Sequence, residues 1–154
     1  MGVRRGRRSA DGAVAVEFAL VMMPLLALVF GLIQYGLYFW AMQGGSDIAR
    51  SAARIAAVDD AATRSCDAFR SDIRSQIDGV TGSGATATIT RTYVDAQSPA
   101  DGITVGDTVK VSVQFKSVDM HFPFVPFIRD GVVTSTASAR LDSVDADNPP
   151  PSCT

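Results

Sequence analysis

The sequence predicts an α+β protein, in which an N-terminal transmembrane helix extends into an amphipathic helix that packs on a small antiparallel sheet of three or four strands. Three observations predict this fold class. A long apolar run follows a basic N-terminus, the run passes into a segment with apolar residues at helical spacing, and the second half alternates with a period of two. The 154 residues have room for one modest domain and an anchor.

Residues 1–12 form a basic leader with four arginines, which we expect to be disordered. Residues 13–45 predict a transmembrane helix, because no charged residue occurs from Phe18 to Gly45 and about 20 apolar residues cross a bilayer. The arginines precede the run, so the positive-inside rule places the N-terminus in the cytoplasm and the C-terminal part outside it. We therefore expect a single-pass protein of the cytoplasmic (inner) membrane with an extracytoplasmic C-terminal domain.

A cleaved secretory signal peptide is the alternative to a retained anchor. Its apolar core would span only about 7–15 residues and end at a small-x-small cleavage site. The run observed is longer and ends in YFWAMQGG, where Tyr38 and Trp40 are typical of an interfacial aromatic belt. The pattern favours the retained anchor.

Residues 46–79 predict an amphipathic helical stem, with Ser46 as a possible cap and Gly79 as a stop. Whether Gly44 and Gly45 break or bend the helix is left open by the sequence. The apolar stripe repeats mostly at steps of three, four or seven among Asp, Arg and Ser. Its members are Ile48, Ala52, Ile55, Ala62, Cys66, Phe69, Ile73 and Ile77.

Residues 80–143 predict an exported β-rich head. The stretch 103–118 gives the clearest strand, with one apolar face and an opposite face of Lys, Ser and Gln. ATATITRTYV and a stretch starting at Val132 predict two further strands, and residues 144–154 form a Pro-rich, extended tail. The apolar face of the clearest strand consists of Val109, Val111, Val113 and Phe115.

Two features of the exported part of the chain allow more than one interpretation. Cys66 and Cys153 lack metal-ligand spacing and in an exported domain form either a disulfide or two unpaired thiols, of which we expect the disulfide. The segment MHFPFVPFIRDG contains Phe122, Phe124 and Phe127. It either folds back onto the seam between helix and sheet or exposes an apolar patch to a partner or the membrane surface.

Motifs for catalysis are absent from the sequence. The only histidine, His121, has no nucleophile or carboxylate pair at a suitable spacing, and no phosphate loop, HExxH or CxxC occurs. Without the leader, 10 of the 14 basic and 15 of the 16 acidic residues remain, a formal charge of −5, which argues against nucleic-acid binding. We expect no enzyme activity, no cofactor, no metal and no small-molecule substrate.

The stretch GAVAVEF places Glu17 fifth and Phe18 sixth after Gly12. This resembles the processing site of type IV pilin-like proteins. The longer string GAVAVEFALVMMPLLALVFGLIQYG is similar to the TadE-like family, the minor pseudopilins of the tight-adherence (Flp) pilus assembly system. Members of that family share a G-x-x-x-V-E-F-A-L core and a following proline, which is Pro24 in this sequence. The resemblance is strong from residue 12 to about 40 and only architectural beyond that.

The resemblance implies that a prepilin peptidase cuts between Gly12 and Ala13. It also implies that Glu17 marks the substrate, with Phe18 beside it, and later offers its carboxylate to the N-terminal amine of a neighbouring subunit. Expected partners are thus the lipid bilayer, the peptidase, other pilin-like subunits and the assembly platform. More than 100 residues follow the anchor, whereas major Flp pilins are very short, so we expect a minor subunit that supports pilus biogenesis and surface adhesion.

Two other functions remain as alternatives. One is an uncleaved single-pass membrane protein whose extracytoplasmic head serves as a binding or scaffold module, with Glu17 as an ordinary interfacial carboxylate. The other is a membrane-tethered enzyme that uses His121. An intact N-terminus would indicate the first, and a hydrolytic activity lost on changing His121 would indicate the second.

Overall fold

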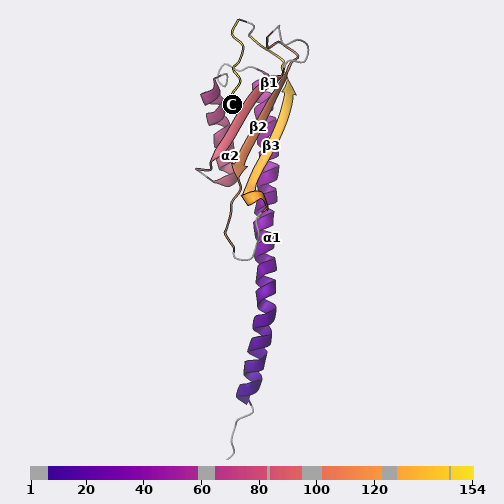
Figure 1. Ribbon diagram of the computed structural model, residues 1–154, viewed down its shortest axis with the longest axis vertical. Coiled ribbons are helices and arrows are strands. Elements are labelled where there is room, and N and C mark those ends of the chain that lie inside the picture. The colour runs from indigo at the N-terminus through magenta and orange to yellow at the C-terminus, as the bar shows by residue number, and fades with distance from the viewer. Residues whose placement is uncertain (1–6, 59–64, 83, 95–101, 123–127, 146) are drawn as a thin grey trace, which may run out of the picture. The chain divides into compact units, whose positions relative to one another are not determined.

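The computed structural model describes residues 7–58, 65–82, 84–94, 102–122, 128–145 and 147–154. It confirms the α+β class (Figure 1). The elements in order are α1 (Arg7–Ala57), α2 (Cys66–Thr81), β1 (Ala87–Val94), β2 (Thr108–Lys116), the 3-10 helix η1 (Ile128–Gly131) and β3 (Val132–Arg140).

The chain divides into two compact units. The first consists of Met1–Gly36 with Met120–Pro126, and the second of Leu37–Asp119 with Phe127–Thr154. The first unit holds residues 13–36 of the predicted membrane anchor, and the second holds the rest of α1 together with α2 and the sheet.

Helix α1 is longer at both ends than the predicted membrane helix. It begins at Arg7, so the expectation that the whole of residues 1–12 is disordered is wrong for the last part of the leader. Extending an existing helix fixes one residue for each hydrogen bond gained, and the leader residues from Arg7 are compatible with a helix. The helix contains Pro24 and continues to Ala57 without a break.

The predicted stem over residues 46–79 is not one helix. Its first part is the end of α1, Val58 lies in a turn, and α2 starts at Cys66. Ser65 caps α2, because its Oγ accepts a hydrogen bond from the backbone N–H of Ala68 at 3.2 Å. Residues 59–64, and with them Ala62 of the predicted stripe, lie outside the described residues. Two helices can each turn an apolar stripe to one sheet face, which a single straight helix of this length cannot do.

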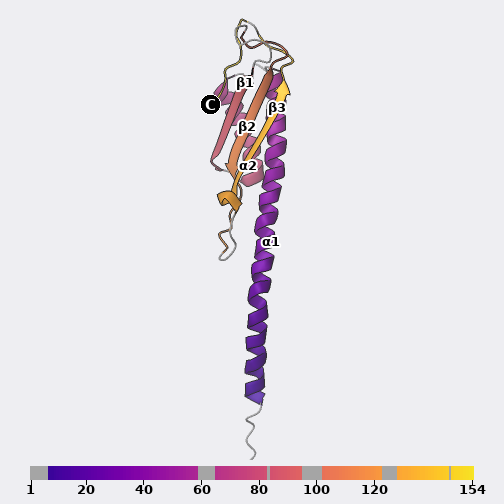
Figure 2. The ribbon, with the colours of Figure 1, turned by 45° about the vertical axis from the view of Figure 1, so that its right-hand side comes forward.

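The three strands form an antiparallel sheet in the order β1-β2-β3. In the register, Ile89 faces Val113 and Val113 faces Ser135. The predicted apolar face of β2 is confirmed, since its four members are at most 1% exposed. The other face of the sheet carries threonine, serine, lysine and glutamine. Figures 1 and 2 show the strands side by side, with α2 next to β1.

The core of the second unit lies between the sheet and both helices. α1 contributes mainly alanines, such as Ala52 at 0% exposure, and α2 contributes Phe69, also at 0%. A Cβ atom at Gly45 would lie 3.0 Å from Cε1 of Phe115. Gly44 and Gly45 therefore do not break the helix. They let it pack closely against its neighbours.

The two residues of the predicted aromatic belt differ in their surroundings. Trp40 is 52% exposed, as an interfacial side chain would be. Tyr38 is only 5% exposed and belongs to the apolar core of the second unit. The prediction of an interfacial position for Tyr38 is wrong, because its side chain lies on the face of α1 that packs inward.

Candidate functional site

The residues that carry the processing motif lie on α1. Gly12, Ala13, Glu17 and Phe18 are all exposed in the single chain, Phe18 at 64%. With a rise of about 1.5 Å per residue, Ala13 and Glu17 are about 6 Å apart along the axis and share one face. Ala13 and the carboxylate of Glu17 therefore lie on the same side of the helix and are accessible from outside the chain.

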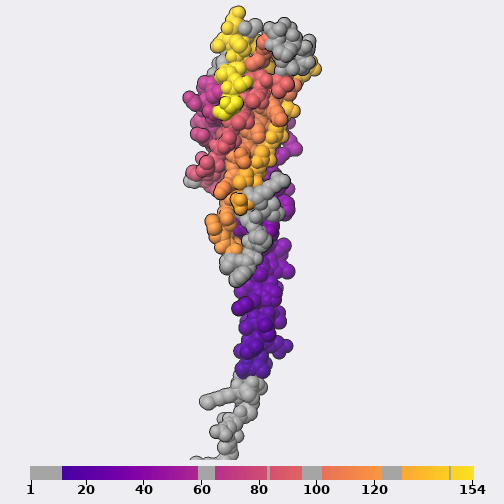
Figure 3. Space-filling view, viewed as in Figure 1, coloured from indigo at the N-terminus to yellow at the C-terminus, as the bar shows by residue number. Residues whose placement is uncertain are grey.

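The surface of α1 after this motif is apolar and uncovered. Its best window has a mean hydropathy of 2.4 with no residue buried, and by length and composition the helix is able to cross a membrane. Leu20, Met23 and Leu32 are 70%, 76% and 68% exposed. Figure 3 shows the indigo side chains of this stretch at the surface of the chain. An apolar surface of this extent needs lipid or other apolar helices around it.

The first unit also contains a contact that the sequence did not suggest. Gln34 is 2% exposed, and its Oε1 accepts a hydrogen bond from the backbone N–H of Met120 at 3.0 Å. One turn away, the rings of Phe30 and Phe122 stack with centroids 4.5 Å apart and planes at 14°. The available signal was a side-chain amide, Gln34, within the charge-free apolar run.

The predicted contact residues of the MHFPFVPFIRDG segment are only partly placed. Phe122 is half-buried against α1. Phe124 and Phe127 lie outside the described residues. His121 is exposed, with a left-handed backbone at φ 51°. Phe122 thus has a defined neighbour on the anchor, rather than on the seam between helix and sheet.

The cysteines of the second unit form a disulfide. Cys66, at the start of α2, is bonded to Cys153 in the tail, with an S–S distance of 2.12 Å and a Cα–Cα distance of 5.5 Å. The tail also pairs with β1, because the backbones of Arg91 and Cys153 exchange hydrogen bonds of 2.8 and 2.7 Å. The predicted extended tail is therefore tied to the edge of the sheet.

A buried arginine joins the tail to the core. Arg91 is 1% exposed, and its guanidinium carbon lies 4.6 Å from the ring centroid of Phe69 and 5.7 Å from that of Tyr93. Its Nη2 donates to the carbonyl of Pro151 at 3.1 Å. Cation–π contacts and a hydrogen bond balance much of the cost of burying this charge. The role of Arg91 is structural.

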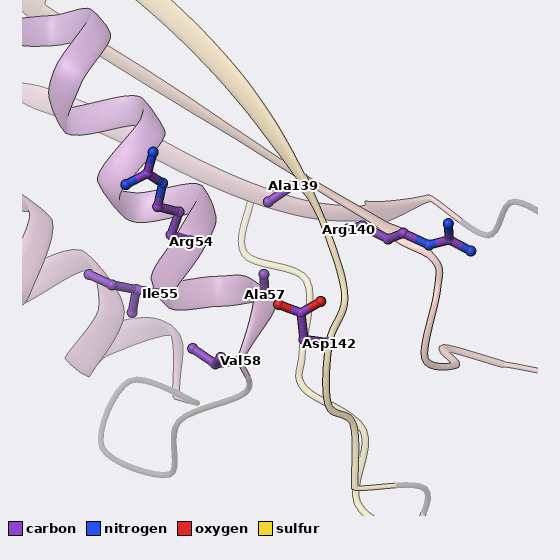
Figure 4. A pocket seen from close by; sticks show the side chains of 7 residues that line it. All are labelled: Arg54, Ile55, Ala57, Val58, Ala139, Arg140 and Asp142. Atoms are coloured by element: carbon purple, nitrogen blue, oxygen red, sulfur yellow. The ribbon is translucent and has the colours of Figure 1, made fainter.

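A pocket of about 600 Å³ lies where α1 ends beside β3 (Figure 4). The backbone N–H of Asp142 donates to the carbonyl of Ala57 at 2.9 Å, so the chain after β3 caps the end of α1. In Figure 4, the side chains of Arg54 and Arg140 point away from each other, so they do not converge on one ligand. No residue of the processing motif lines this pocket.

Among the residues that the structure describes, no group of three or more His, Cys, Asp or Glu side chains is placed to hold a metal ion. The described residues instead form a long apolar helix, which carries Gly12, Glu17 and Phe18 near its start, and a head that is held by a disulfide.

The comparisons with known proteins agree with this description. The family model described as TadE-like protein matches residues 12–54, from the glycine of the motif to the last turn of α1. This confirms the resemblance seen in the sequence. No curated protein and no solved structure matches the chain.

Proposed function

Since the chain is TadE-like over residues 12–54, we propose that it is a minor pseudopilin of a tight-adherence (Flp-type) pilus assembly system, cleaved by a prepilin peptidase between Gly12 and Ala13. It supports pilus biogenesis and, through the pilus, surface adhesion. The TadE-like family is a family of pilus assembly proteins and is generally non-enzymatic. The observation that carries the proposal is the coincidence of the family match with the motif, because the match begins at Gly12 itself.

Cleavage at this position requires access to the peptide bond. Gly12 and Ala13 are exposed, and a Cβ atom built on Gly12 would meet no atom within 4 Å. The bond lies in α1, so the peptidase has to unwind the first turns of the helix before it can cut. Gly12 lowers the cost of that unwinding by about 1 kcal/mol relative to an alanine at the same position.

The membrane topology follows from charge and from the disulfide. Four arginines precede the span, which favours a cytoplasmic N-terminus. The Cys66–Cys153 disulfide favours an oxidising compartment for the head. Both features support a position of the head outside the cytoplasm.

Glu17 has a role in assembly under this proposal. Cleavage creates a positively charged amine at Ala13, and Glu17 of one chain pairs with that amine on a neighbouring pilin-like subunit. An unpaired carboxylate among apolar helices costs several kcal/mol, so the pair also specifies how the helices align. The exposed apolar surface of α1 supplies the packing between subunits.

A processing assay with matched variants tests the proposal. The full chain is expressed with the prepilin peptidase, and the intact mass of the product is measured for the wild type, Gly12→Arg and Gly6→Arg. We expect the wild type and Gly6→Arg to lose the leader and to give the same mature mass. Gly12→Arg should stay full length, because the bulky cation does not fit where the peptidase accepts a small residue.

Two results would overturn the proposal. If Gly12→Arg is cut as well as Gly6→Arg, another bond is the processing site. If none of the three is cut, the chain is the uncleaved anchored module, and Glu17 is an interfacial carboxylate.

A further inference from the structure

The position of Phe30 and Gln34 relative to the bilayer is determined by the length of the charge-free stretch. A span needs about 20 residues, and the stretch runs from Phe18 to Gly45. Every such window within the stretch contains both Phe30 and Gln34, wherever it starts. Both residues therefore lie at the depth of the membrane when α1 crosses it.

The segment Met120–Phe122 lies at the same depth. It belongs to the same compact unit as Met1–Gly36. Phe122 stacks on Phe30 at 4.5 Å, and the N–H of Met120 is bonded to Gln34 at 3.0 Å. Two independent contacts, one apolar and one polar, thus fix this segment to the part of α1 that crosses the bilayer.

The hydrogen bond to Gln34 is what an irregular backbone requires at this depth. Hydrocarbon offers no water to a backbone N–H, and an unsatisfied polar group there costs several kcal/mol. The side-chain Oε1 of Gln34 accepts the hydrogen bond from the backbone N–H of Met120, and Gln34 is itself removed from solvent at 2% exposure. This bond satisfies the Met120 N–H without water.

From these contacts we propose that Met120 and Phe122 insert into the outer layer of the bilayer beside α1, with lipid acyl chains as their partner. The inference rests on the proposed membrane span. Met120 is 47% exposed, and Phe122 is half-buried with one ring face on Phe30. Their outward surfaces are apolar, which suits acyl chains.

Neighbouring polar residues set how far the segment enters. Asp119 and His121 are exposed and fit the headgroup layer rather than the hydrocarbon, because a central charge costs about 2.5–3.5 kcal/mol. The segment therefore enters only the outer part of the hydrocarbon layer.

Depth-dependent fluorescence quenching tests the insertion, because the chain has one tryptophan. Trp40→Phe gives a tryptophan-free background for the full-length protein in phosphatidylcholine vesicles. Single tryptophans are then introduced by Phe122→Trp, Phe30→Trp and, as a water-exposed control in the head, Val94→Trp. Each is measured with lipids brominated on the acyl chains and with acrylamide in water.

We expect Phe122→Trp and Phe30→Trp to lose emission to the brominated lipids to a similar extent, whereas Val94→Trp responds only to acrylamide. Quenching of Phe30→Trp but not Phe122→Trp by lipid overturns the insertion and leaves the membrane span intact. Quenching of neither overturns the span and the insertion together. A Phe122→Trp signal shielded from both quenchers shows that protein, not lipid, covers the segment, and this also overturns the proposal.

A second variant tests the role of Gln34 in positioning the segment. Gln34→Leu removes the acceptor while making α1 more apolar, so the helix itself remains in the membrane. We expect Phe122→Trp to lose most of its quenching by lipid in this background and to gain quenching by acrylamide, with Phe30→Trp unchanged. Unchanged quenching of Phe122→Trp would show that the hydrogen bond does not hold the segment in place.

Discussion

The disulfide gives the strongest prediction for the stability of the head. Cys66 and Cys153 are separated by 87 positions, so their bond restricts a long loop of the unfolded chain. The loop-entropy relation gives about 4.6 kcal/mol of stabilisation at 25 °C for a loop of this length. Engineered and native disulfides deliver between about 2 and 5 kcal/mol in practice. We therefore expect Cys66→Ala/Cys153→Ala to lose stability in that range.

In the double alanine variant, only hydrogen bonds hold the tail to the sheet. The exchanged backbone pair of Arg91 and Cys153 and the hydrogen bond from Arg91 to Pro151 do not depend on the sulfur atoms. Each contributes about 1 kcal/mol. The folded head should therefore keep its near-ultraviolet circular dichroism in water, and the loss should appear on denaturation.

The assay is a urea titration of the full-length protein in a nonionic detergent, followed by near-ultraviolet circular dichroism. At a slope of about 2 kcal/mol per M, the midpoint should fall by about 1–2.5 M. Wild-type protein treated with a reductant should behave like the double alanine variant. Ser71→Ala/Ser152→Ala, which changes two exposed residues near the bridge, serves as control and should stay within about 0.5 kcal/mol. An unchanged midpoint on loss of the disulfide would refute the reasoning.

Three further predictions concern packing, capping and assembly. Gly45→Val places a side chain against Phe115 and should lower the free energy of unfolding by about 1–3 kcal/mol. Gly79→Ala has open space around it and should raise the free energy of unfolding by about 0.5–1 kcal/mol. If both variants change the urea midpoint equally, Gly45 does not pack closely against Phe115. Ser65→Ala removes the cap of α2 and should cost about 1 kcal/mol in the same assay, and a neutral result would argue against the cap. Glu17→Gln should leave membrane insertion unchanged but reduce the yield of sheared pili, and a wild-type yield would argue against the carboxylate's role in assembly.

Local patterns were enough to predict the long apolar helix and the strands. A charge-free run of sufficient length can only be buried or placed in lipid, and the alternation in β2 determined which side chains face the core. The antiparallel sheet and the apolar face of Val109 and Val111 were therefore predicted correctly. These features depend on residues close in sequence.

Features that depend on distant residues were not predicted. The spacing from Ile48 to Ile77 fits one long helix, and only the geometry of the sheet requires the chain to leave α1 at Ala57 and start again at Cys66. Tyr38 looked interfacial because nothing local shows which face of α1 meets the head.

The same limit applies to the candidate site. Gly12 and Glu17 were singled out by the resemblance of GAVAVEF to the processing site of type IV pilin-like proteins. The bond between Gln34 and Met120 joins residues 86 positions apart and became visible only in the folded chain. The tail contact of Arg91 likewise needed the structure, although its inward position follows from the alternation with Ile89 and Tyr93 on β1.

We propose that this chain is a processed pseudopilin, and the N-terminal sequence of the native protein is the most direct test of that processing. The protein is purified from cells with and without the prepilin peptidase, and the first residues of each product are determined. We expect AVAVEF, starting at Ala13, in cells with the peptidase and an intact leader in cells without it. A chain that keeps its leader in both strains, or loses it in both, is not a substrate of the peptidase, and the proposal is then wrong.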